Sequence, residues 1–143
     1  MGTTNYTNTF IAVAEDSLNP EGRAEPTGIT PPHGEDGQTI AELQFELLQA
    51  RPYAYTSDEL IFEVHSRRKG LLDEERDAAW DEFFARDQAC LRSSPLAKRY
   101  GWGFHFDERG RVGLVPVGSA DYQRLSTDKG LAQKQALRSS RKV

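Results

Sequence analysis

The chain has 143 residues, the size of one domain, and such a domain buries roughly 70% of the surface that its unfolded chain exposes. Its 37% hydrophobic and 28% charged residues are typical of a globular protein and argue against disorder of the whole chain. The net charge of −4 conceals a division of sign, because residues 1–88 hold 7 Lys/Arg against 18 Asp/Glu, whereas residues 89–143 hold 11 against 4. The acidic total argues against a dedicated nucleic-acid-binding protein.

The sequence carries no signal for export or for membrane insertion. Its first residues lack the basic and apolar regions of a signal peptide, and no stretch approaches the roughly 20 apolar residues that span a bilayer. The single cysteine, Cys90, cannot form an intramolecular disulfide, which agrees with a reducing compartment. We therefore expect a cytoplasmic protein with no membrane partner.

The first third of the chain predicts a strand, a long loop and a helix. Residues 9–14 are apolar and partly β-branched, which is typical of a buried strand. Residues 17–37 contain four prolines and little to bury, so we expect a surface loop there. Apolar residues at helical spacing over 39–50, together with a capping box at Thr39 and Glu42, predict an amphipathic helix.

Residues 57–69 fit two patterns. A capping box at Thr56 and Glu59, with acids first and bases last before Gly70, favours a helix. A strand is the alternative, because apolar residues also alternate with period two between positions 60 and 64.

The remaining elements are short. Residues 73–87 predict a helix with acids in its first turn and three aromatic residues on one face, which should anchor the core. A helix of about two turns is predicted over 95–100, and alternating apolar residues on both sides of a turn predict a β-hairpin over 102–117. Another short helix over 120–125 and a basic helix or extended tail over 131–143 complete the chain.

Together these elements predict a single α+β domain over residues 1–143. Its small, mostly antiparallel sheet should contain the hairpin, and the helices near 39–50, 57–69 and 73–87 should cover one side of that sheet.

Three stretches of the chain carry a resemblance to known sequences. They are Thr3-Thr4-Asn5-Tyr6, Tyr55-Thr56-Ser57-Asp58 and CLRSSPLAKRYGWG, which begins at Cys90. On these motifs the chain resembles an uncharacterised family of small microbial proteins, catalogued as a domain of unknown function, over nearly its whole length. The resemblance implies a stand-alone cytoplasmic protein and implies no activity, cofactor or catalytic residue.

The basic half contains a candidate anion site where the tetrapeptide LRSS precedes a predicted helix start. Unpaired amides at such a start can bind a phosphate or carboxylate, which Arg92 could clamp while serine hydroxyls donate to it. A second LRSS at 137–140 could fold over the first. The bland alternative is that Ser94 is only an N-cap and the cations only a solvated face. The expected ligand-binding residues are Arg92, Ser93, Ser94, Lys98, Arg99, Trp102, Arg138 and Ser139.

Two other functions remain open. An enzyme could use Cys90 or His105 at the same pocket, with Arg92 lowering the pKa of the thiol and with His105 or His65 as its base. The structural alternatives are a buried apolar cysteine and a hydrogen-bonded histidine. An interaction module could instead join acidic and basic surfaces of partners or of copies, which would lead to self-association.

The sequence contains none of the spacings that hold a metal or a nucleotide. There is no paired Cys or His motif, no calcium loop, and neither GxxxxGK nor GxGxxG. We therefore expect a small anionic ligand, no metal and no cofactor, and the type of reaction stays open.

Overall fold

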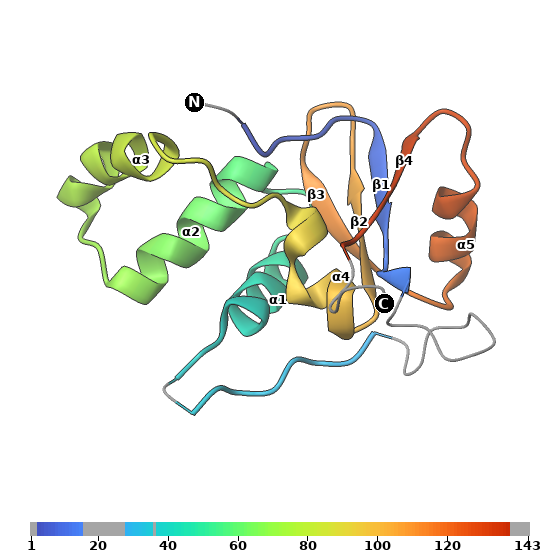
Figure 1. Cartoon of the computed structure of the whole chain (residues 1–143), viewed down its shortest axis with the longest axis horizontal. Helices are drawn as coiled ribbons and strands as arrows, with labels where there is room; N and C mark the ends of the chain where they lie inside the picture. The colour runs from blue at the N-terminus through green and yellow to red at the C-terminus, as the bar shows by residue number, and fades with distance from the viewer. Residues whose placement is uncertain (1–2, 16–27, 36, 138–143) are drawn as a thin grey trace, which may run out of the picture.

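Four strands form one mixed sheet in the computed structural model of the chain, which describes residues 3–15, 28–35 and 37–137 (Figure 1). The strands are β1 (Thr9–Ala12), β2 (Trp102–Phe106), β3 (Val112–Pro116) and β4 (Ala132–Gln135). Their order is β3-β2-β1-β4, with β2 antiparallel to both neighbours and β4 parallel to β1. The predicted α+β class is confirmed, but the sheet is not purely antiparallel.

Helices pack on both faces of this sheet. They are α1 (Ile40–Ala50), α2 (Ser57–Lys69), α3 (Arg76–Phe84), α4 (Pro95–Arg99) and α5 (Ala120–Ser126), with the short 3-10 turns η2 (Asp73–Glu75) and η3 (Leu91–Ser93) before α3 and α4. Figure 1 shows α1 and α4 on one side of the sheet and α5 on the other. It also shows α3 stacked on α2, away from the sheet, so the segment predicted at 73–87 does not cover the sheet directly.

The pleat of β2 separates two apolar cores. Its three aromatic side chains face the larger core, between the sheet and α1, α2 and α4: Trp102, Phe104 and Phe106. Gly103 and His105 alternate with them and so face α5. A Cβ on Gly103 would lie 2.9 Å from the Phe10 ring and 3.0 Å from the Tyr122 ring, so only glycine fits there without a shift.

Side-chain caps begin α1 and α2 at the residues that the sequence predicts. The Thr39 hydroxyl accepts the amide of Glu42 at 3.1 Å and begins α1. At the start of α2 the Thr56 hydroxyl accepts the Glu59 amide at 3.2 Å, and the Glu59 carboxylate accepts the Thr56 amide at 2.9 Å. Gly70 ends α2 at a φ of 67°. The helix prediction is confirmed over the strand alternative.

The aromatic residues of α3 bind α3 to α2. The Phe62 ring of α2 lies 5.0 Å from the Trp80 ring and 5.9 Å from the Phe83 ring. Phe84 is buried, whereas Trp80 and Phe83 stay half-buried. α3 is therefore anchored to α2 rather than to the sheet, and Trp80 and Phe83 keep part of their apolar surface exposed.

The C-terminal segment differs from its prediction. Residues 132–135, expected as part of a basic helix or tail over 131–143, add β4 to the sheet, and residues 138–143 lie outside the described part of the chain. Of the predicted loop over 17–37, most lies outside the described residues too. Its described end packs on the fold, since the amide of Ile29 donates to the carbonyl of Tyr100 at 3.0 Å.

Candidate functional site

An N-terminal clasp, formed by residues 3–5 on Ser57 and Asp58, holds the start of α2. The Asp58 carboxylate accepts hydrogen bonds from the Thr3 hydroxyl at 2.7 Å, the Thr4 amide at 2.8 Å and the Thr4 hydroxyl at 2.6 Å. The Thr4 and Ser57 hydroxyls lie 2.8 Å apart, and the Asp58 amide donates to the side-chain oxygen of Asn5 at 2.9 Å. Two of the stretches that carry the family resemblance are therefore structural partners.

Tyr6 extends this clasp to the third stretch. Its hydroxyl donates to the sulfur of Cys90 at 3.2 Å, and its ring packs 5.3 Å from that of Phe106. Burial and the hydrogen bond to Cys90 raise the pKa of Tyr6 to about 12, so the phenol stays protonated at neutral pH. The Cys90 thiol therefore faces a hydrogen-bond donor rather than a base on this side.

The start of α4 has no unpaired amide to offer an anion. Pro95 has no N–H, and the amide of Leu96 donates to the Ser94 hydroxyl at 3.2 Å. The amides of Ala97 and Lys98 both donate to the Ser94 carbonyl, at 3.2 and 3.1 Å. Ser94 itself is buried and donates to the side-chain oxygen of Gln44 at 2.6 Å. Ser94 therefore acts as the N-cap of α4, which is the structural alternative to an anion-binding role.

Other members of the predicted anion cluster also serve the fold. The Arg92 guanidinium donates through Nε to the carbonyl of Gln135 at 2.6 Å and so ties η3 to β4. Trp102 is buried and donates through Nε1 to the Ile29 carbonyl at 2.8 Å, which leaves no exposed ring face for stacking a ligand. Arg138 and Ser139 lie outside the described residues.

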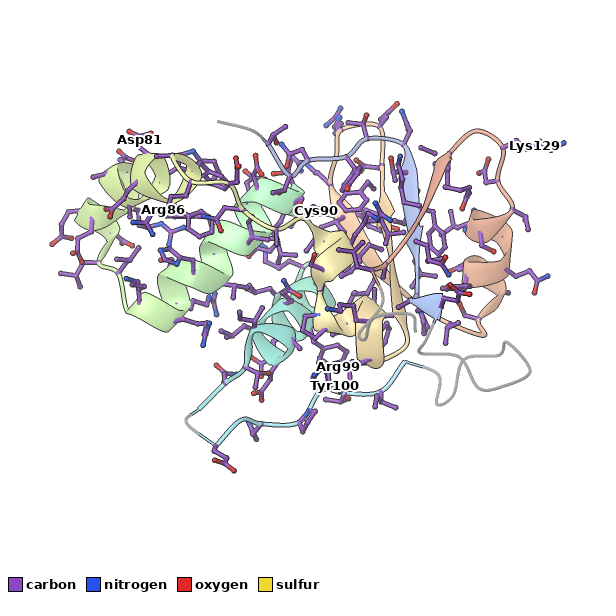
Figure 2. The ribbon with its side chains drawn as sticks, viewed as in Figure 1. Asp81, Arg86, Cys90, Arg99, Tyr100 and Lys129 are labelled. Atoms are coloured by element: carbon purple, nitrogen blue, oxygen red, sulfur yellow. The ribbon has the colours of Figure 1, made fainter. Side chains whose placement is uncertain are left out.

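Two described cations of the C-terminal half, Arg99 and Lys129, lie on distant parts of the fold. Figure 2 places Arg99 at the lower end of α4 next to Tyr100, and Lys129 at the far tip of the α5–β4 connection. Cys90 lies between α2 and η3, well apart from both. Lys98 and Arg99 lie on α4, and neither lines the groove between α1 and α2.

A groove of about 610 Å³ lies between α1, α2, Phe83 of α3 and the segment 88–95. Apolar side chains form much of its wall, and Ile40 contributes one that is 42% exposed. We call it the basic groove. Its lining residues are Ile40, Gln44, Ile61, Val64, His65, Arg68, Lys69, Phe83, Gln88, Ala89, Cys90, Leu91, Ser93, Ser94 and Pro95.

The lining of the basic groove contains no carboxylate. Arg68 and Lys69 stand at its edge on the last turn of α2 and form no ion pair with any described residue. Gln44 uses its side-chain oxygen to accept from Ser94, so its NH₂ group and the Ser93 hydroxyl are donors without a partner among the described residues. The polar part of the groove therefore favours an anion.

His65 belongs to the same wall. Its ring lies 4.5 Å from the Phe83 ring, and burial, with Lys69 and Arg68 nearby, lowers its pKa below the ordinary value despite the opposing charge of Glu82. At neutral pH the imidazole is therefore neutral, and the groove owes its positive charge to Arg68 and Lys69.

Comparison with known proteins gives one family. The model of a family of unknown function, DUF6157, matches residues 1–142. The chain belongs to this family. No curated protein and no solved structure matches the chain. Membership in the DUF6157 family confirms the resemblance carried by the three motifs and assigns no activity.

The sheet keeps the two candidate catalytic residues of this family member apart. Cys90 contacts Tyr6 in the larger core, whereas His105 points to the α5 face. There His105 Nδ1 shares a 2.8 Å hydrogen bond with the Tyr53 hydroxyl, and burial lowers the pKa of the imidazole. His65, not His105, shares a cavity with Cys90.

Sequence reasoning missed the cations of the basic groove. Arg68 and Lys69 belong to the basic run that ends α2 before Gly70, and such a run is ordinary at a helix C-terminus. The signal that could have found them is their helical spacing from Ile61, Val64 and His65, which places a cationic end beside an apolar stripe. Among the described residues, no three metal-ligating side chains gather, and no helix has the length and apolar character needed to cross a membrane.

Proposed function

We propose that this protein is a cytoplasmic binding protein for a small amphipathic anion, one with an apolar body and a carboxylate or phosphate group. The observation that carries the proposal is the composition of the basic groove, which joins an apolar wall to two unpaired cations and excludes carboxylates from its lining. Its volume of about 610 Å³ is in the usual range of small-molecule sites, roughly 300–1,000 Å³.

The chemistry divides between the two ends of the groove. The apolar body of the ligand would pack on Ile40, Ile61 and Val64, where burial of hydrocarbon is favourable by about 25 cal/mol per Å². The anionic group would accept charge-assisted hydrogen bonds at Arg68 and Lys69, which are worth about 1.5–3 kcal/mol each. The proposal keeps the small anionic ligand and moves its site from the start of α4 to the end of α2. Ser93 and Ser94 are common to both sites.

The test compares ligands that share an alkyl chain and differ in whether the head group is anionic. Isothermal titration should detect octanoate and octyl phosphate on the wild-type protein, whereas 1-octanol, which has the same apolar body without the charge, should bind at least about tenfold more weakly. Replacing Arg68 and Lys69 together by Ala should remove this preference for the anion, because the cations supply it.

A matched control lies one residue away. Arg67 is on the same helix turn, is 52% exposed and pairs with Glu63 rather than lining the groove. Arg67→Ala should therefore leave octanoate affinity unchanged. Equal binding of octanoate and octanol, or equal losses in the two variants, would contradict the proposed function.

A further inference from the structure

The opposite face of α2 borders a second cavity, of about 300 Å³, between α2 and α3. Three aromatic rings line it, from Tyr55, Phe62 and Trp80. Three carboxylates line it as well, from Glu59, Glu63 and Asp77, and one cation, Arg76, completes the wall. We call it the acidic aromatic cleft, and its charge is opposite to that of the basic groove.

Helical spacing creates this cleft. Glu59, Phe62 and Glu63 lie three and four positions apart on α2, so they share one face of that helix. Asp77 and Trp80 are three positions apart on α3 and share the face of α3 that borders the cleft. The Trp80 and Phe62 rings meet at 5.0 Å where the two helices touch.

Among the described residues, arginine side chains neutralise only one of the three carboxylates. Arg76 donates to Glu63 at 2.8 Å, and Arg67 donates to the same carboxylate at 3.0 Å. Burial alone would raise the pKa of Glu63, but these two hydrogen bonds hold it below the ordinary value. Glu59 accepts only the backbone amide of Thr56, and Asp77 has no ionic or hydrogen-bonding partner among the described residues. Two negative charges are therefore left without a cation.

The rings of the cleft already hold cations of this chain. The guanidinium carbon of Arg51 lies 5.7 Å from the centroid of the Tyr55 ring, and that of Arg76 lies 5.3 Å from the centroid of the Phe62 ring. No described cation stacks on Trp80, although indole is the ring that binds cations best. Trp80 is half-buried, so part of its surface is accessible.

We propose that the acidic aromatic cleft binds an alkylammonium cation, held on the Trp80 ring and balanced by Asp77 and Glu59. A methylated ammonium group suits this wall because it spreads its charge over apolar methyl groups and needs few hydrogen-bond acceptors. The site does not depend on the anion proposed for the basic groove. Its ligand carries the opposite charge and contacts the opposite face of α2.

The experiment titrates choline into the ¹⁵N-labelled protein and follows the two tryptophan indole N–H signals. The Trp80 signal should move in a saturable way, whereas the Trp102 signal should stay fixed, because Trp102 is buried and donates to the Ile29 carbonyl at 2.8 Å. The neutral isostere 3,3-dimethyl-1-butanol should leave both signals in place, because it has the shape of choline without its charge.

Two variants of α3 test the role of the carboxylate. Asp77→Asn should weaken choline binding about fivefold, since it removes one of the two uncompensated charges. Asp81→Asn, one turn further along α3 and outside the cleft, should leave it unchanged (Figure 2). A choline titration that leaves Trp80 unmoved, or an equal response to the neutral isostere, would overturn the proposal. An equal effect of both variants would also overturn it, because the attraction would then be general rather than local.

Discussion

The two faces of α2 both combine apolar and charged side chains, but their charges have opposite signs. One face turns Ile61, Val64 and Arg68 toward the basic groove, and the other turns Phe62 and Glu63 toward the acidic aromatic cleft. Apolar alternation along this helix therefore does not mark one buried stripe. It marks two walls, each covered by a different part of the chain.

The same spacing explains why the two walls do not mix their charges. Residues four positions apart share a face, so His65 and Lys69 extend the basic wall while Glu59 and Glu63 extend the acidic one. Arg67 falls between the walls and pairs with Glu63 at 3.0 Å. This ion pair neutralises the charge of Arg67 on the part of α2 between the two walls.

Removing the Phe62 side chain should disturb both the basic groove and the acidic aromatic cleft, and it should cost the most stability. Phe62 is 3% exposed and its ring contacts Trp80 and Phe83, which border the cleft and the groove. Phe62→Ala should lower the free energy of unfolding by about 3–4 kcal/mol in urea denaturation, because it opens a cavity between α2 and α3. Leu72→Ala, at a side chain that is 58% exposed, is the control and should cost less than about 0.5 kcal/mol. A loss below about 1 kcal/mol for Phe62→Ala would mean that α3 is not held through this ring.

The second effect destabilises the first turn of α2. Asp58→Ala removes the acceptor of three hydrogen bonds from the N-terminal clasp and should cost about 2 kcal/mol of stability. Asp87→Ala, which removes an exposed carboxylate outside the clasp, serves as the control in the same denaturation series. If the two variants unfold at the same urea concentration, the clasp does not stabilise the fold.

The third effect is limited to the acidic wall and depends on pH. Glu63→Gln should cost about 1 kcal/mol at neutral pH, because two arginines hydrogen-bond to the carboxylate in a partly exposed setting. The pKa of Glu63 is lowered in the folded state, so its stabilisation is present above the ordinary glutamate pKa and is lost as the pH falls through the lowered value. Unfolding of the variant and the wild type should therefore converge in acid. A difference that is independent of pH would exclude this ionic origin.

The smallest effect belongs to the basic wall. Burial and Lys69 lower the pKa of His65, so the ring is neutral at neutral pH and gains a positive charge only in more acidic solution. A bound anion beside the ring favours its protonation. Octanoate affinity should rise by up to about threefold as the pH falls below the ordinary histidine pKa of about 6.5, and His65→Gln should remove the rise. Glu82 is the one acid that opposes the shift, so Glu82→Gln should leave the direction unchanged. An unaltered pH profile in His65→Gln would assign the titration to another group.

Local signals predicted the elements of this fold well, because caps and turns act within a few residues. Thr39 and Thr56 begin their helices as expected, and the hairpin of β2 and β3 follows from alternation and its turn. β4 could not be predicted in this way. Its sequence AQKQ is polar and exposed, and its pairing with β1 joins residues far apart in the chain.

The site was harder to predict for the same reason. The residues around Ser94 have the composition of an anion site, but the neighbours that consume their hydrogen bonds, Gln44 and Gln135, come from distant elements. The basic groove and the acidic aromatic cleft likewise form only when α2 meets segments on both sides. The sequence shows charge and apolar periodicity, but it does not show whether a residue lines the basic groove or the acidic aromatic cleft.

The most direct test of two opposed sites on one helix is a double titration followed by ¹H–¹⁵N correlation spectra. Octanoate should shift signals from the last turn of α2 and from residues 89–94, whereas choline should shift the Trp80 indole and signals around Asp77. Saturation with either ligand should leave the midpoint of the other unchanged. If octanoate and choline perturb the same residues, or if neither saturates, α2 does not separate two binding sites.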